Sequence, residues 1–92
     1  MNDEELKILD DEYDSKYYVL GNTVPVRVIF TKRDGLKAGA IAPDIHLGEL
    51  TWRHELLSRL EQSYEVEAID GEEFYRLCRA FQKPAVPPRR ND

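Results

Sequence analysis

The sequence has few of the features that usually mark a small secreted, membrane-bound or metal-binding protein. Its 92 residues include one cysteine, Cys78, so neither a disulfide within the chain nor a cysteine metal cluster can form. The longest apolar runs are a few residues, whereas a helix needs roughly 18–20 to cross a bilayer. Residues 1–5 are acidic, unlike the basic start of a signal peptide. We therefore expect a cytoplasmic protein with no membrane contact.

Catalytic groups are equally scarce. The five glycines are scattered along the chain, so no glycine-rich phosphate loop is present. Cys78 falls on the apolar side of a predicted helix, where burial raises the pKa of a thiol and makes it unreactive. Glu65 and Glu67 lie on the outward side of a predicted strand, where acids usually serve solvation. A chain this short also has little interior for a walled active site. We expect no enzymatic activity, no catalytic residues and no cofactor.

One connecting segment does gather oxygen and imidazole ligands. They are Asp44, His46, Glu49, His54 and Glu55. Seven residues separate the two histidines, which is not the i,i+4 pairing that places two imidazoles on one helix face. A polar connection with surface histidines explains the same residues, so we expect no metal site.

The negative charge is concentrated at the amino-terminal end. The net charge is −5, but residues 1–15 hold seven acids and one base, and residues 16–92 are nearly balanced. We interpret residues 1–15 as an acidic, mobile arm. Leu6, Leu9 and Tyr13 recur at helical spacing, so a short helix docked on the body or on a partner is the alternative.

At the other end, residues 84–92 contain three prolines and two arginines. Proline lacks a backbone donor and disfavours helical geometry in the preceding residue, so we expect a disordered tail. The intervening residues 16–83 are then predicted to form one small domain.

Residues 16–31 predict two strands around a turn at residues 21–23, because they are rich in aromatic and β-branched side chains. An odd-length turn pairs Leu20 with Val24 and Tyr18 with Val26. Asp34 and Gly35 are typical of a two-residue hairpin loop, and such a loop pairs Val28 with Ile41. These two registers place one set of side chains on the core face. The set comprises Tyr18, Leu20, Val24, Val26, Val28, Phe30 and Ile41. The other face, with Tyr17, Arg27 and Ile29, is apolar enough to need a covering helix or partner.

Two helices and a further strand follow. Residues 52–62 predict a helix with Thr51 as its N-cap, and residues 64–68 alternate as a strand does. Asp70 and Glu73 have the spacing of a capping box before a last helix. Its apolar side chains are Phe74, Leu77, Cys78 and Phe81. The predicted fold is α+β, a single small domain of β-β-β-α-β-α order with a mostly antiparallel sheet and two helices.

Two surfaces are candidates for function. Trp52, Arg53 and Tyr17 are of the types that most often anchor protein interfaces. The basic residues Arg27, Lys32, Arg33 and Lys37 gather at the second hairpin and could hold phosphates, but the nearly neutral body and acidic arm oppose strong nucleic-acid binding. Our hypothesis is a small non-enzymatic protein-binding protein, regulatory or neutralising, whose partner is another protein. The alternative is a nucleic-acid-associated regulator that uses the basic hairpin.

Overall fold

The computed structural model of the chain describes residues 1–21, 23–44, 49–62 and 65–82. Within these ranges the chain forms three helices and five strands. They are α1 (Asp3–Glu12), β1 (Tyr13–Leu20), β2 (Val24–Thr31), β3 (Lys37–Pro43), β4 (Leu50–Trp52), α2 (Glu55–Gln62), β5 (Val66–Ile69) and α3 (Gly71–Gln82). No helix in the described ranges is long and apolar enough to cross a bilayer.

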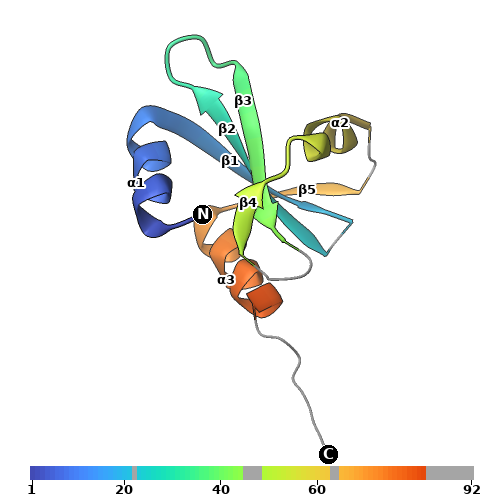
Figure 1. Cartoon of the computed structure of the whole chain (residues 1–92). Helices are drawn as coiled ribbons and strands as arrows, with labels where there is room; N and C mark the ends of the chain where they lie inside the picture. The colour runs from blue at the N-terminus through green and yellow to red at the C-terminus, as the bar shows by residue number, and fades with distance from the viewer. Residues whose placement is uncertain (22, 45–48, 63–64, 83–92) are drawn as a thin grey trace, which may run out of the picture.

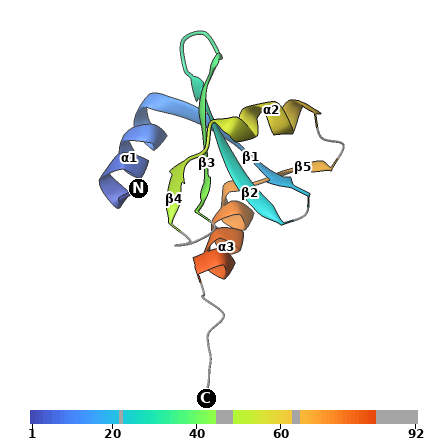
Figure 2. The same cartoon turned by 45° about the vertical axis from the view of Figure 1, so that its right-hand side comes forward.

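The strands form one antiparallel sheet in the order β4-β3-β2-β1-β5. The chain passes from one edge, β4, through α2 to the other edge, β5 (Figure 1). Helix α2 packs on one face, and α1 and α3 pack on the other (Figure 2). The α+β class predicted from the sequence is confirmed, with α1 as an additional helix.

Alternation along β2 divides the core into two layers, because successive side chains of a strand point to opposite faces. Val26 and Val28 pack with Leu56 on the α2 side. Ile29 packs with Phe74 on the side of α1 and α3. The sequence predicted that a helix or a partner covers the face of Tyr17, Arg27 and Ile29. In the structure α1 and α3 cover this face.

The first hairpin has the predicted register. Leu20 pairs with Val24 and Tyr18 with Val26. Gly21, at the end of β1, has φ 62°, a left-handed conformation that glycine adopts without a steric penalty. The turn chemistry and the two apolar faces therefore select one pairing.

The second hairpin is present, but its predicted register is wrong by one residue. Val28 pairs with Ala40 and Arg27 with Ile41, and the register shifts between Ile29 and Phe30. The turn is longer than two residues, since the Gly35 N–H donates to the Thr31 carbonyl oxygen at 2.9 Å. A shift of one residue moves every side chain of a strand to the opposite face. Ile41 therefore packs with Ile29 under α1 and α3 instead of with Val28.

Residues 3–12 follow the alternative that the sequence left open, a helix docked on the body instead of an arm. The Asn2 side chain accepts from the Glu5 N–H at 2.9 Å, and the Glu5 carboxylate accepts from the Asn2 N–H at 3.1 Å. Leu9 is buried, and Leu6 packs against the same core. Strand β1 starts at Tyr13, so the sheet includes residues 13–15. The predicted tail, residues 84–92, lies outside the described residues.

The helix predicted over residues 52–62 begins later, at Glu55. Leu50–Trp52 instead form β4, which pairs Pro43 with Leu50 and Ile41 with Trp52. Thr51 is thus a strand residue, and the prediction that it caps the helix is wrong. The segment forms a strand because Leu50 is buried in the core and the backbone groups of β3 are available for pairing beside it.

Helix α3 has the predicted start and the predicted inward face. The Asp70 Oδ1 accepts from the Glu73 N–H at 2.8 Å, so the N-cap is confirmed. Phe74 and Cys78 are buried. The side chain of Phe81 lies outside the described part of the chain.

Candidate functional site

Two of the exposed apolar side chains lie together on the surface. Three large hydrophobic residues of the described chain are exposed: Ile8 at 53%, Leu36 at 62% and Trp52 at 42%. Ile8 and Trp52 line the same hollow of about 170 Å³, together with Met1, Glu5 and Leu9. We call these five residues the Trp52 surface. Contiguous exposed apolar groups of this kind mark interaction sites more often than isolated ones do.

The Trp52 surface is built from α1 and the edge strand β4, which lie side by side (Figure 2). Ile8 comes from the exposed side of α1, one residue before the buried Leu9. Trp52 is the last residue of β4. The Met1 nitrogen donates to the Leu50 carbonyl oxygen at 2.8 Å, so the start of α1 is tied to β4.

The Trp52 ring packs against His54 and the backbone of β3. It stacks on the imidazole of His54, with ring centroids 5.1 Å apart and planes 17° apart. Both rings lie directly on the backbone of β3 at Gly39. A Cβ at Gly39 would lie 2.6 Å from His54 Cε1 and 2.8 Å from Trp52 Cζ3. Glycine at this position therefore allows the two rings to approach the sheet.

Acidic side chains surround Ile8. Residues three and four positions apart are neighbours on a helix surface, and at these distances from Ile8 the chain places Glu4, Glu5, Asp11 and Glu12. All four are exposed. One of them, Glu5, also lines the hollow, so negative charge lies on its α1 side.

A buried arginine fixes α1 to the sheet. Arg27 is completely buried, and its guanidinium donates to Ser15 Oγ at 2.9 Å, to Tyr75 Oη at 2.8 Å and to Asp10 Oδ1 at 2.5 Å. The guanidinium also lies 5.7 Å from the centre of the Tyr17 ring. Burial raises the pKa of Tyr75, so this hydroxyl stays protonated. Arg27 therefore joins α1, β1 and α3, and it has no surface from which to reach a phosphate.

The other two candidates for protein binding are engaged within the protein. Arg53 Nε lies 2.6 Å from Glu55 Oε2, and this hydrogen bond lowers the pKa of Glu55. The Tyr17 ring packs against Phe74, with centroids 5.2 Å apart, and lies under α3. Of the three predicted residues, Trp52 alone is exposed. The sequence analysis did not identify Ile8. The signal available for it was its position as an apolar residue among acids, in a segment whose other apolar residues recur at helical spacing.

The basic residues of the second hairpin do not form one free surface. Lys32 Nζ donates to the Asp11 carbonyl oxygen at 2.8 Å. Lys37 Nζ lies 2.6 Å from Glu61 Oε2, and this hydrogen bond lowers the pKa of Glu61. Arg33 is exposed at the turn. Lys32, Arg33 and Lys37 are therefore all exposed, but two of them contact helices and Arg27 is buried.

The remaining chemical groups have structural surroundings. Cys78 is buried on the inward side of α3, as predicted, and burial raises the pKa of its thiol to about 12. His46 lies outside the described residues; within those described, no group of three or more histidine, cysteine, aspartate or glutamate side chains could hold a metal ion. Comparisons with protein-family models, with curated proteins and with solved structures find no match, so the geometry of the Trp52 surface is the basis for its interpretation.

Proposed function

We propose that this protein is a small non-enzymatic module that binds another protein through the Trp52 surface. The observation that carries the proposal is the exposure of Ile8 and Trp52 in one hollow. Tryptophan is among the residues that contribute most to binding when an interface covers them. An apolar side chain of the partner that enters the hollow would remove both residues from water.

The charge around Ile8 supports a partner of particular chemistry. Four exposed acids neighbour Ile8 on α1, and one of them, Glu5, lines the hollow, so a partner with lysine or arginine around its apolar side chain would be attracted. Complementary charge raises the association rate and disfavours partners of the wrong sign. We therefore infer a basic protein surface with one protruding apolar side chain.

The fixed geometry of the site also favours binding. The stacking of Trp52 on His54 and the attachment of α1 through Arg27 hold both halves of the hollow in place before a partner arrives. Ordering side chains at an interface costs about 0.5–1.5 kcal/mol for each flexible one. A preformed hollow avoids part of this cost.

Affinity capture with matched variants tests the proposal. The immobilised full chain is exposed to extract of its native host, with and without nuclease treatment. The retained proteins are compared between wild type, Trp52→Ala, Ile8→Ala and the control Leu36→Ala. Among the described residues, Leu36 is the third exposed large hydrophobic residue, and it lies outside the Trp52 surface. We expect both site variants to lose the same retained protein and the control to keep it.

The affinity for that protein then provides the quantitative result. A tryptophan at the centre of an interface costs 2 kcal/mol or more on truncation, which corresponds to roughly a 30-fold loss of affinity. Unchanged retention by both site variants, with native circular dichroism spectra, would contradict the proposal. If nuclease removes all retained material and Arg33→Glu abolishes retention, nucleic-acid binding takes its place.

A further inference from the structure

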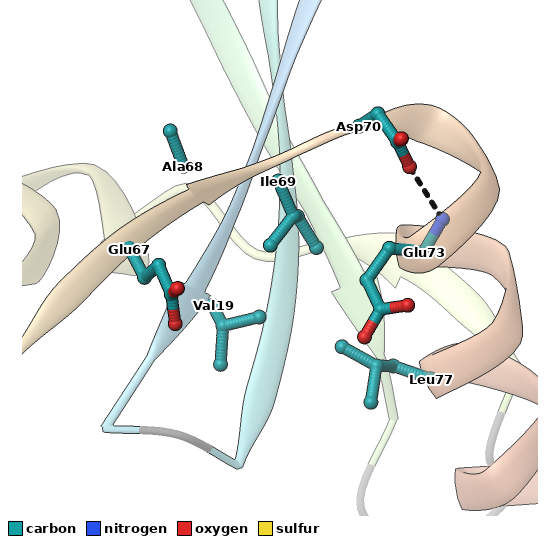
Figure 3. Close-up of a pocket in the computed structure, with 7 residues that line it drawn as sticks. All are labelled: Val19, Glu67, Ala68, Ile69, Asp70, Glu73 and Leu77. Atoms are coloured by element: carbon teal, nitrogen blue, oxygen red, sulfur yellow. Dashed lines mark hydrogen bonds between the residues drawn. The ribbon is translucent and has the colours of Figure 1, made fainter.

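The sheet edge opposite the Trp52 surface carries a second hollow. It has a volume of about 640 Å³ and lies between β5 and α3. Its lining residues are Val19, Glu67, Ala68, Ile69, Asp70, Glu73 and Leu77 (Figure 3). None of them belongs to the Trp52 surface, so an inference from this hollow is independent of the proposed function.

The backbone of β5 offers hydrogen-bonding groups beside this hollow. The Gly21 N–H donates to the Glu65 carbonyl oxygen at 2.7 Å, and Glu67 pairs with Val19 in the same register. In an antiparallel pair, alternate residues direct their N–H and C=O groups toward the partner. Val66 and Ala68 therefore direct theirs away from β1. No strand in the described part of the chain pairs with that side of β5.

The hollow combines an apolar floor with an acidic rim. Val19 is buried, and Ile69 and Leu77 are partly exposed. Figure 3 shows Glu67 extending beside Val19 and Glu73 extending toward Leu77. Hydrogen bonding to Arg76 lowers the pKa of Glu73. Glu67 is exposed and has no ion-pair partner among the described residues.

These features suit a lysine or arginine side chain. Such a side chain buries its hydrocarbon stem along an apolar surface and keeps its cation near water, so the stem matches the floor and the cation matches Glu67. Three carboxylates line the hollow, those of Glu67, Asp70 and Glu73, and Arg76 forms an ion pair with Glu73, so the lining itself is negative. The same charge opposes pairing of β5 with a second copy, because the edges would bring like acids together.

We infer that the β5 edge binds an extended, basic peptide segment of a partner protein by strand addition. The segment pairs with the N–H and C=O groups of Val66 and Ala68, as added strands do at exposed sheet edges. One of its lysine or arginine side chains lies across Val19 and Leu77 and reaches Glu67. Since β5 has four residues, the paired part of the segment is similarly short.

Nuclear magnetic resonance titration of the full chain tests this inference. The probe is a short, end-blocked peptide of alternating lysine and valine, and the matched peptide has glutamate in place of lysine. We expect saturable shifts of the Val66 and Ala68 amides with the lysine peptide only. N-methylation of the peptide residues that face β5 should abolish these shifts, whereas N-methylation at the alternate residues should preserve them.

Matched charge reversals separate a specific site from general attraction. Glu67→Lys should weaken binding of the lysine peptide at least tenfold, whereas Glu72→Lys should change it less than threefold. Glu72 is an exposed acid of α3 outside this hollow. Equal effects of both reversals, shifts spread over all acidic surfaces, no saturable shifts, or a dimer formed through β5 would each overturn the inference. Trp52→Ala should leave the titration unchanged, so the failure of one proposal does not imply failure of the other.

Discussion

The contact between Asp10 and Arg27 should decide whether α1 stays docked. Among the described residues, the buried Arg27 guanidinium forms an ion pair with one carboxylate, that of Asp10. Asp10→Ala removes this carboxylate. Breaking a fully buried ion pair costs about 3–5 kcal/mol, and an exposed pair contributes about 0–1 kcal/mol. The Arg27 side chain is 1% exposed but that of Asp10 is 60% exposed, so water can partly replace the carboxylate. We therefore expect Asp10→Ala to lower the free energy of unfolding by about 1–3 kcal/mol.

A double-mutant cycle isolates this contribution. In an Arg27→Met background the guanidinium is absent, so Asp10→Ala should then cost less than about 0.5 kcal/mol. The two substitutions should therefore couple by at least about 0.5 kcal/mol. Arg27→Met itself leaves the Ser15 and Tyr75 hydroxyls without this donor and should cost about 1–3 kcal/mol. Urea unfolding measures all four variants through their midpoints and slopes.

Asp11→Ala is the matched control for this cycle. Asp11 is the next acid on α1 and is exposed, and α1 has no basic residue in its last turn. Negative charge near a helix C-terminus is unfavourable, so removing Asp11 should be neutral or stabilise by a few tenths of a kcal/mol. If Asp10→Ala costs the same in both backgrounds, or no more than Asp11→Ala, the argument that Arg27 holds α1 is refuted.

Four further predictions concern α3. Asp70→Ala should cost about 0.5–2 kcal/mol because it removes the N-cap acceptor of the helix, and Phe74→Ala should cost about 3–5 kcal/mol because the ring is fully buried; an unchanged urea midpoint would contradict either one. Cys78 should react with a thiol reagent at pH 8 only as fast as the protein opens, so equal rates in native and urea-unfolded protein would contradict its burial. Burial raises the pKa of Cys78 from 9 to about 12, so the folded state binds more protons than the unfolded state between these values. Stability should therefore be unaffected by this thiol below about pH 9 and fall above it by at most about 1.4 kcal/mol per pH unit; Cys78→Ala should flatten that slope.

Parts of the fold with strong local signals were predictable. The first hairpin combines a glycine-containing turn with two apolar faces, and this combination permits one register. Helix α3 has both a capping acid at Asp70 and apolar side chains at helical spacing, and each of these signals agrees with the other. Agreement between local signals is what makes such elements predictable.

Other parts depend on tertiary contacts that composition does not reveal. Residues 3–12 are acidic enough to suggest a solvated arm. In the structure Asp10 of this segment contacts Arg27, a residue that the sequence analysis assigned to a basic surface. No glycine, proline or other turn residue in the sequence marks the register shift between Ile29 and Phe30. This shift places Ile41 on the other face of the sheet. Strand β4 has three residues, too few to show alternation. Ile8 can be assigned to the Trp52 surface only from the structure, because the sequence does not show that α1 lies beside β4.

Site-specific photo-crosslinking in the native host tests the central claim most directly. A photoreactive amino acid replaces Ile8 in one variant and Leu36 in the other, both in the full chain. The account predicts one discrete protein adduct from position 8, absent from position 36 and lost when Trp52→Ala is added. No adduct from position 8, or adducts of equal yield from both positions, would contradict binding through the Trp52 surface.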